Sequence, residues 1–206
     1  MLTPEQLAAL RAIDSTTVAN AIEAFDVRDR SVGYAVTAIG DSSTPGRPKG
    51  REGLYRLWEA LAGAPKPAVV VIKDVGSDRD RSCLCGDVMA NTAKALGAVG
   101  LITDGGVRDL AEVRALDFQF FAPGAVVSHG NFGILDVGVP VDIGGASIRP
   151  GDLIHGDANG FVVIPDGVAD RVAAEAQKVR EREAQMIDFV RSPDFSLAGL
   201  KKLMGL

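Results

Sequence analysis

Three charged residues stand where two predicted helices begin, and their types suit the binding of a metal and an acid. Asp87 opens one helix, and Arg108 and Asp109 open the next. Carboxylate oxygens are the ligands that Mg2+ and Mn2+ prefer, with waters in the remaining positions. A guanidinium donates a forked pair of hydrogen bonds to a carboxylate, and free N–H groups at a helix start, here those of Val88 and Met89, attract anions. The pattern therefore predicts a site for a divalent cation and a small anionic molecule.

The same residues have a local explanation, in which they only begin their helices. Asp109 and Glu112 are spaced like a capping box, and Asp87 has the type of an N-cap residue. On the local pattern alone, this explanation is the commoner one. Arg108 favours a site instead, because a positive charge at the positive end of a helix is unfavourable and needs a partner. That partner is either an anionic substrate or Glu112.

Two predicted strands must position these residues. The apolar runs 67–76 and 98–106 have the length and the β-branched composition of buried strands. They precede a helix predicted over 86–97, closed by Gly97, and a second helix over 108–116. If both strands lie in one sheet, both helix starts emerge at the same edge of that sheet.

Further helices and a loop complete the first half of the chain. Helices are predicted from Thr3-Pro4 onward, over 15–25 and over 51–63, with a glycine- and proline-rich loop over 40–50. The apolar face of the third of these helices consists of Leu54, Leu57, Trp58 and Leu61.

The second half of the chain changes character. Residues 118–165 form short apolar runs broken by glycine or proline, which is typical of short strands with tight turns. A long charged helix follows over about 166–191. Its buried stripe is predicted to be Val168, Val172, Ala176, Val179, Met186 and Val190. This order of elements indicates a single layered α/β domain over 1–206, with mixed sheets and a long C-terminal helix.

The composition excludes several partners and compartments. The net charge is −5 and the pI about 5.1, so there is no electrostatic case for nucleic acid. No apolar run has the length that spans a bilayer, and the first helix carries Glu5 and Gln6 rather than the features of a signal peptide. A cytoplasmic protein without nucleic-acid or membrane partners is expected. Cys83 and Cys85 are expected to be reduced thiols packed near a strand end.

The spacing of the charged residues resembles a family signature. Asp87, then twenty residues, then Arg108-Asp109, then two residues and Glu112 is similar to the pattern of the RraA-like family. That family includes aldolases acting on 4-hydroxy-4-methyl-2-oxoglutarate and 4-carboxy-4-hydroxy-2-oxoadipate. The resemblance covers most of 69–165. It implies a swivelling β/β/α-type fold, homotrimers or homohexamers with sites between subunits, and a class II mechanism that uses Mg2+ or Mn2+.

The resemblance also implies roles for individual residues. By position, Asp109 resembles the direct metal ligand, Asp87 the acid that orients metal-bound waters, and Arg108 the substrate-binding arginine. The backbone from Gly86 through Val88 to Met89 resembles the cradle of the pyruvyl carboxylate. Glu112 matches the acidic position of the catalytic members.

A further glutamate is implied from the neighbouring subunit, with Glu181 and Glu183 as the two candidates. Two departures from the family pattern stand out. Asn20 lies where many relatives have an aspartate, and the pair Cys83 and Cys85 is unusual.

The activity that the resemblance implies is cleavage of 2-oxo-4-hydroxy acids to pyruvate. Oxaloacetate decarboxylation passes through the same pyruvate enolate, so one site is expected to perform both reactions. A non-catalytic regulator that binds ribonuclease E is the alternative, and Glu112 favours the enzyme. A Schiff-base mechanism through Lys73 is a second alternative. A solvated Lys73 beside Asp74 is the preferred interpretation of that lysine.

Overall fold

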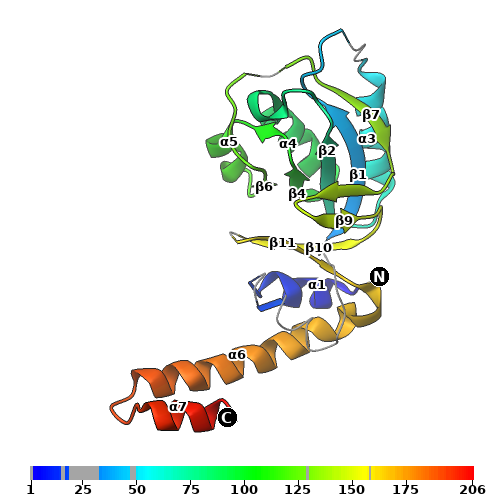
Figure 1. The fold of residues 1–206 in the computed structure, drawn as a ribbon. Helices are drawn as coiled ribbons and strands as arrows, with labels where there is room; N and C mark the ends of the chain where they lie inside the picture. Colours follow the sequence, from blue (N-terminus) through cyan, green and yellow to red (C-terminus); the bar gives the residue numbers. More distant parts are fainter. Residues whose placement is uncertain (1, 15–16, 19–32, 47–49, 129, 158) are drawn as a thin grey trace. The chain divides into compact units, whose positions relative to one another are not determined.

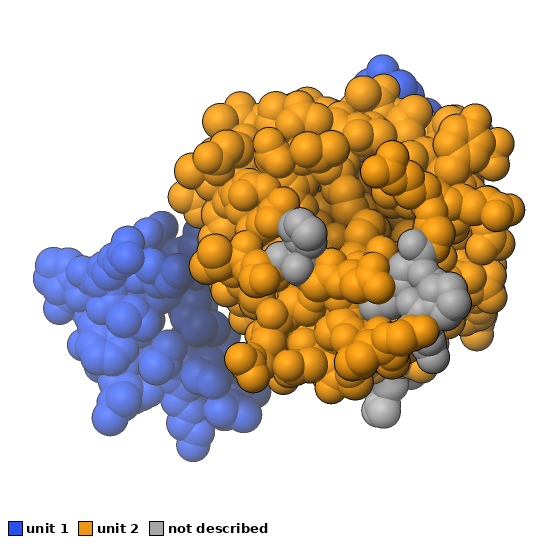
Figure 2. All heavy atoms as spheres, turned by 90° about the horizontal axis from the view of Figure 1, so that it is seen from above, with its two compact units in different colours: residues 1–28, 167–206 blue, residues 29–166 orange. Residues whose placement is uncertain are grey.

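The computed structural model describes residues 2–14, 17–18, 33–46, 50–128, 130–157 and 159–206. These residues belong to two compact units, one of 29–166 and one of 1–28 with 167–206 (Figure 2). The expectation of a single domain over 1–206 stays a prediction. All the residues of the two predicted helix starts, from Gly86 to Glu112, lie in the unit of 29–166.

A seven-stranded mixed sheet forms the centre of the unit of 29–166 (Figure 1). The strand order is β11-β10-β1-β2-β4-β6, and β7 also pairs with β1. Strands β1, β2, β4 and β6 run parallel, whereas β7, β10 and β11 pair in antiparallel fashion. Their bounds are β1 Tyr34–Asp41, β2 Ala68–Asp74, β4 Ala98–Thr103, β6 Gln119–Phe121, β7 Gly133–Val137, β10 Leu153–Asp157 and β11 Gly160–Ile164.

Strand β2 is apolar from Ala68 to Ile72 because both of its faces are covered. Val70 and Ile72 belong to a core cluster with residues of α3 (Glu52–Gly63) and α4 (Asp87–Ala95). Val69 and Val71 belong to a second cluster with the hairpin of β8 (Val141–Ile143) and β9 (Ala146–Ile148). A strand buried on both sides reads as a continuous hydrophobic run, which explains why it was predictable from the sequence.

The helices predicted around this sheet are confirmed. In α3, Leu57 and Leu61 are fully buried, and Leu54 and Trp58 pack against the same core. Helix α4 ends before Gly97, whose φ of +90° is one that glycine adopts without strain. Helix α5 (Leu110–Ala115) packs beside α4 (Figure 1).

Strand β1 was not predicted, although it pairs with three other strands. Its small residues weaken the apolar signal, and packing explains why they are small. A Cβ on Gly40 would lie 3.0 Å from Ile72 Cγ2 and 3.1 Å from Leu84 Cδ1. Close approach of β2 and of the segment around Leu84 therefore leaves little room for a larger side chain at this position.

The two helix starts are held by a second, two-stranded sheet, and this differs from the predicted arrangement. Strand β3 (Cys83–Cys85) directly precedes α4, and β5 (Gly106–Val107) precedes the start of α5. The two strands pair in parallel, so both helices begin on the same side of the pair. The long strands β2 and β4 are also parallel neighbours, but each is separated from its helix by an inserted segment.

Gly106 is required by close packing. A Cβ on Gly106 would lie 2.5 Å from Val126 Cγ2 and 3.0 Å from the carbonyl oxygen of Ser82. The run predicted as one strand over 98–106 therefore ends earlier, and a separate short strand begins at Gly106 and fits tightly between its neighbours.

The unit of 1–28 and 167–206 is helical in its described part. Helix α1 (Pro4–Arg11) begins where the sequence predicts, and the structure adds a capping box between Thr3 and Gln6. Helix α6 (Ala169–Arg191) follows a short 3-10 turn, η2 (Asp166–Val168), and leads into α7 (Leu197–Leu203). The helix predicted over 15–25 lies largely outside the described residues.

The stripe predicted on the long helix is correct only in its first half. Val172, Ala176 and Val179 are buried, whereas Met186 is partly exposed and Val190 is 45% exposed. Arg180 of α6 forms an ion pair with Asp14 at 3.0 Å. Among the described residues, no helix combines the length and the hydropathy that crossing a bilayer requires.

Candidate active site

The starts of α4 and α5 are joined by one hydrogen bond. The backbone N–H of Asp87 donates to Oδ2 of Asp109 at 3.0 Å, across 22 residues of chain. Gly86 permits this approach, because a Cβ at Gly86 would collide with Asp109 Oδ2 and lie 3.1 Å from Arg108 Cγ. The fold thus brings together four of the predicted site residues, namely Gly86, Asp87, Arg108 and Asp109.

The local capping explanation of Asp109 does not describe this structure. Asp109 is the N-cap residue of α5, but its side chain makes no hydrogen bond to that helix. Its φ of 58° and ψ of 41° lie in the left-handed region, which costs a non-glycine residue about 1 kcal/mol. Strained backbone of this kind is concentrated at functional sites, where the surrounding structure holds a side chain in place.

Arg108 pairs with its sequence neighbour. Its Nε lies 3.4 Å from Asp109 Oδ2, and the side chains are 37% and 31% exposed. The Arg108 N–H donates to the carbonyl oxygen of Cys85 at 3.0 Å, which ties this residue to β3. Glu112, the other partner considered from the sequence, is exposed on α5, and no ion pair is found for it among the described residues.

A cavity of about 470 Å3 opens beside these helix starts. Most of the predicted binding residues line it, namely Gly86, Asp87, Val88, Met89 and Arg108. Asp109 and Glu112 are not among the lining residues. The remaining lining residues are Arg51, Cys83, Leu84, Gly130 and Phe132.

The predicted carboxylate cradle is partly occupied by the chain itself. The N–H of Val88 donates to Oδ1 of Asp87 at 2.7 Å, and the N–H of Asp87 is taken by Asp109. A bound carboxylate would therefore have to take the N–H of Val88 from Asp87. This exchange would release an oxygen of Asp87 inside the cavity.

The two cysteines are free thiols and both are buried, as predicted. Burial raises the pKa of Cys83, and the nearby Arg108 guanidinium partly offsets this effect. Burial raises the pKa of Cys85 more strongly, with smaller contributions from Cys83 and Asp109. Both thiols therefore stay protonated near neutral pH, and Cys83 is a neutral part of the cavity wall.

A buried polar network at the carboxyl ends of the parallel strands was not predicted. Asp74, at the end of β2, is 1% exposed and accepts hydrogen bonds from Ser42 N at 3.1 Å and Gly76 N at 2.8 Å. The Ser42 hydroxyl donates to the same carboxylate. Ser42 is distant from Asp74 in the sequence, and Gly76 lies in a loop whose composition does not indicate the bond. No local pattern therefore predicts this network.

Lys73 belongs to this network and not to a solvated pair with Asp74. Its ammonium group binds Oδ2 of Asp104 at 2.5 Å, and Arg79 binds the same oxygen at 2.8 Å. Asp104 also accepts the N–H of Asp74 at 2.8 Å. Lys73 is not among the residues that line the cavity beside the helix starts, which does not favour a role as a Schiff-base nucleophile there.

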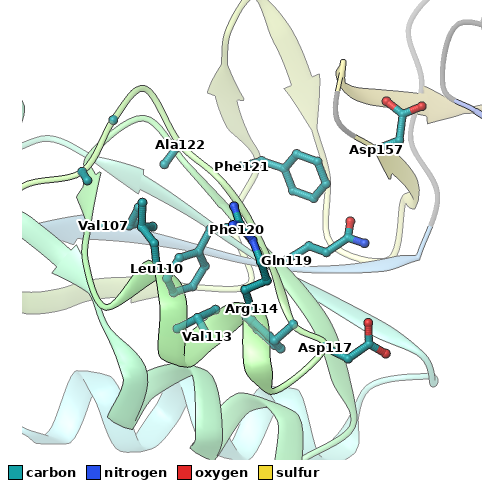
Figure 3. Close-up of a pocket in the computed structure, with 13 residues that line it drawn as sticks. Val107, Leu110, Val113, Arg114, Asp117, Gln119, Phe120, Phe121, Ala122 and Asp157 are labelled. Carbon is teal, nitrogen blue, oxygen red and sulfur yellow. The ribbon is translucent and has the colours of Figure 1, made fainter.

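A second cavity, of about 510 Å3, begins at the residues that flank the Arg108-Asp109 pair (Figure 3). Val107 and Leu110 line it together with Phe120 and Arg114. In Figure 3, Phe120 turns toward Leu110 and Val113, while Phe121 turns toward the opposite side of β6. The residues that line this cavity are mainly apolar.

The carboxylate oxygens at the two helix starts suit a divalent cation that keeps most of its water ligands. Among the described residues, no three His, Cys, Asp or Glu side chains gather into a ligand set. Mg2+ is commonly held by only one or two carboxylates with several waters. The carboxylates of Asp87 and Asp109, which belong to the two joined helix starts, are two in number and so fit that requirement.

The predicted neighbour-subunit glutamates both lie on α6 and are exposed. Glu181 accepts a hydrogen bond from Gln177 at 2.9 Å. Asn20, the departure noted in the early helix, lies outside the described residues.

The chain is also similar in sequence to known proteins. A sequence model of the RraA-like family (Aldolase/RraA) matches residues 9–163. A protein of Halalkalibacterium halodurans, provisionally named 4-hydroxy-4-methyl-2-oxoglutarate aldolase, is 35% identical over 167 residues, which are 79% of this chain and 73% of that protein. An uncharacterized protein of Methanocaldococcus jannaschii is 30% identical over 136 residues, which are 64% of this chain and 65% of that one.

Solved structures share the fold. An uncharacterized protein of Pseudomonas syringae pv. tomato superposes with a TM-score of 0.76 at 24% identity, covering 99% of this chain and 94% of that one. RraAS2 of Streptomyces coelicolor, described as an unusual member of the RNase ES inhibitor RraA protein family, has a TM-score of 0.67 at 22% identity, covering 89% and 96%. The predicted α/β fold with a mixed sheet and a long C-terminal helix is thereby confirmed. With its family match over 155 residues from 9 to 163, this chain belongs to the RraA-like (Aldolase/RraA) family.

Proposed function

We propose that this chain is a divalent-metal-dependent aldolase that cleaves 2-oxo-4-hydroxy acids of the 4-hydroxy-4-methyl-2-oxoglutarate type to pyruvate. The observation that carries the proposal is the junction of the two helix starts, where Asp109 bonds the N–H of Asp87 beside Arg108. A carboxylate, a guanidinium and a small cavity lie together there. The aldolase name of the Halalkalibacterium relative supports the reaction class.

The lining residues can bind the substrate and move its protons. The substrate carboxylate binds the N–H groups of Val88 and Met89, and Arg108 binds an anionic oxygen of the 2-oxo acid. Breaking the C3–C4 bond leaves its electron pair on the pyruvate enolate. Asp87 takes the proton of the 4-hydroxyl, directly or through a water that it orients, and returns a proton to C3 of the enolate.

A divalent metal and Glu112 are the remaining parts of the proposed site. A divalent cation such as Mg2+ or Mn2+, held by Asp109, would place positive charge next to the enolate oxygen. Glu112 is proposed as an auxiliary acid of the site. Because Asp109 bonds the N–H of Asp87 whereas Glu112 is exposed on α5, Glu112→Gln is expected to lower activity less than a change at Asp109 does.

The test is a coupled assay of pyruvate release from 4-hydroxy-4-methyl-2-oxoglutarate and from oxaloacetate, on wild type and Asp109→Asn. Asparagine tolerates the left-handed backbone and keeps an oxygen that accepts the Asp87 N–H, so the fold is expected to persist. Loss of the negative charge is expected to lower kcat/KM by about a hundredfold or more. EDTA is expected to abolish the wild-type activity, and borohydride is expected to have no effect.

The alternative, a regulator that binds ribonuclease E without catalysis, makes the opposite prediction. The likeness to RraAS2 is one of fold at 22% identity and does not favour that function. Absence of metal-dependent pyruvate release from both substrates would favour the regulator and overturn the aldolase.

We also propose a homotrimer or homohexamer with sites between subunits. Two apolar side chains beside the site support it, because Val88 is 73% exposed and Leu110 is 45% exposed. A neighbouring copy would cover such side chains and would supply Glu181 or Glu183 to the site.

A further inference from the structure

We propose that Arg51 binds the second carboxylate of the substrate, so that the cavity prefers dicarboxylic over monocarboxylic oxo acids. This inference rests on the proposed function, since it concerns how the same cavity selects its substrate. Arg51 lies outside the motif that carries the family resemblance. Its role is inferred from the lining of the cavity, from its place on α3 and from the balance of charge.

The cavity brings together two guanidinium-bearing residues from distant parts of the chain. Arg51 comes from the start of α3, and Arg108 from the start of α5. Asp87 is the only acidic side chain among the lining residues. A volume of about 470 Å3 lies in the range of small-molecule sites. A lining with two cations and one acid suits a ligand that carries two negative charges.

The position of Arg51 is unfavourable for the helix that follows it. Arg51 is the N-cap residue of α3, and its side chain makes no capping hydrogen bond. A cation at a helix N-terminus is opposed by the helix dipole. Among the residues that the structure describes, no ion pair or side-chain hydrogen bond of Arg51 is found. The helix gains nothing from this guanidinium, which leaves it available for an anion from outside the chain.

The rest of the lining leaves a second carboxylate no other cationic partner. Leu84, Met89 and Phe132 are apolar, and Cys83 stays neutral at physiological pH. If the 2-oxo carboxylate occupies Arg108 and the start of α4, the remaining cation is Arg51. A methyl group in place of the distal carboxylate would leave Arg51 without an anion.

The experiment compares two substrates that both release pyruvate. One is 4-hydroxy-4-methyl-2-oxoglutarate, and the other is 4-hydroxy-2-oxopentanoate, which lacks the distal carboxylate. Arg51→Gln is expected to lower kcat/KM for the dicarboxylate by about ten- to hundredfold, the size of one lost charge-assisted contact, and to leave the monocarboxylate within about twofold. Arg51→Lys keeps the charge and is expected to retain most of the preference.

A matched control lies on the same helix. Arg56 of α3 is outside the cavity lining, and its guanidinium donates to the carbonyl oxygen of Leu135 at 3.3 Å. Arg56→Gln is expected to leave the ratio of the two kcat/KM values unchanged. The melting temperature of Arg51→Gln is expected to equal or exceed that of wild type, because the change removes a charge that opposes the dipole of α3.

Equal losses on both substrates, or no loss on either, would overturn the role of Arg51 while leaving the aldolase intact. If wild type releases no pyruvate from either substrate, the proposed function fails, and calorimetric binding of 2-oxoglutarate and 2-oxopentanoate then decides on Arg51. Weaker binding of 2-oxoglutarate alone in Arg51→Gln would still support the carboxylate contact, and unchanged binding would overturn it.

Discussion

At the scale of single residues, the site depends on how little space separates Gly86 from Asp109. The Asp109 carboxylate reaches the N–H of Asp87 only because residue 86 has no side chain in its path. Gly86 itself has φ −133° and ψ −161°, a backbone that any residue can adopt. The requirement for glycine at this position is therefore one of space and not of backbone freedom.

Gly86→Ala is expected to lower the activity strongly and the stability only slightly. The new Cβ would force the Asp109 carboxylate away from the Asp87 N–H, and Asp109 is the proposed metal ligand. Since a partly exposed carboxylate can rotate away, the free energy of unfolding is expected to fall by only about 1 kcal/mol. Pyruvate release is expected to fall by about tenfold or more. Steady-state kinetics and urea unfolding measure the two quantities.

The control for this prediction is Gly63→Ala at the end of α3. A Cβ there would meet no atom within 4 Å, so neither activity nor stability is expected to decline. Wild-type activity in Gly86→Ala would mean that the orientation of Asp109 is not needed for the reaction.

At the scale of elements, the polar network around Asp74 supports the segment that leads to the site. Asp74 ends β2 and bonds the start of the loop after β1 through Ser42. Ser82, just before β3, donates to the carbonyl oxygen of Ser42 at 2.8 Å. Through these bonds, the carboxyl ends of the long strands position β3, which carries the start of α4.

Asp74→Ala is expected to destabilise the fold. It would leave the buried N–H groups of Ser42 and Gly76 without their acceptor. Since an unsatisfied buried group costs on the order of 1–3 kcal/mol, the free energy of unfolding is expected to fall by about 3 kcal/mol. Urea denaturation with a constant m-value would measure it.

Asp80→Ala serves as the comparison for a surface carboxylate. The Asp80 side chain is 85% exposed and lies 3.9 Å from Arg79 Nε, so its loss is expected to change stability by less than about 0.5 kcal/mol. Equal stability of the Asp74 and Asp80 variants would show that the network contributes nothing to folding.

At the scale of the whole molecule, the proposed sites between subunits can be tested by mixing inactive chains. Each of Glu181→Gln and Glu183→Gln is assayed first, and the one that loses activity identifies the glutamate used. That variant is then co-expressed with Asp109→Asn. If each site combines Asp109 of one chain with the glutamate of its neighbour, mixed oligomers regain about a quarter of the wild-type activity.

Each inactive variant alone is expected to stay inactive, and light scattering is expected to give three or six times the chain mass of 21.5 kDa. Failure of the mixed oligomers to recover activity, with both variants assembled, would place the whole site within one chain. Full activity of both glutamine variants would exclude a role for these two glutamates.

Much of the framework was determined by the sequence. Burial on both faces makes β2 and most of β4 apolar, and burial on one face sets the spacing of Leu57 and Leu61 in α3. Such periodicity can be recognised locally, because the apolar residues of each helix or strand recur at regular intervals along that element. The motif from Asp87 to Glu112 was likewise visible as residue types at set positions.

Tertiary structure alone decided which of those residues meet. The sequence left Asp109 with a cap on its own helix as the commoner explanation, but its carboxylate bonds a residue 22 positions away. The partners of Asp74 and the place of Arg51 in the cavity are equally long-range. The physical reason is that hydrogen bonds and ion pairs act across space over a few ångströms, whereas a sequence pattern records only neighbours along the chain.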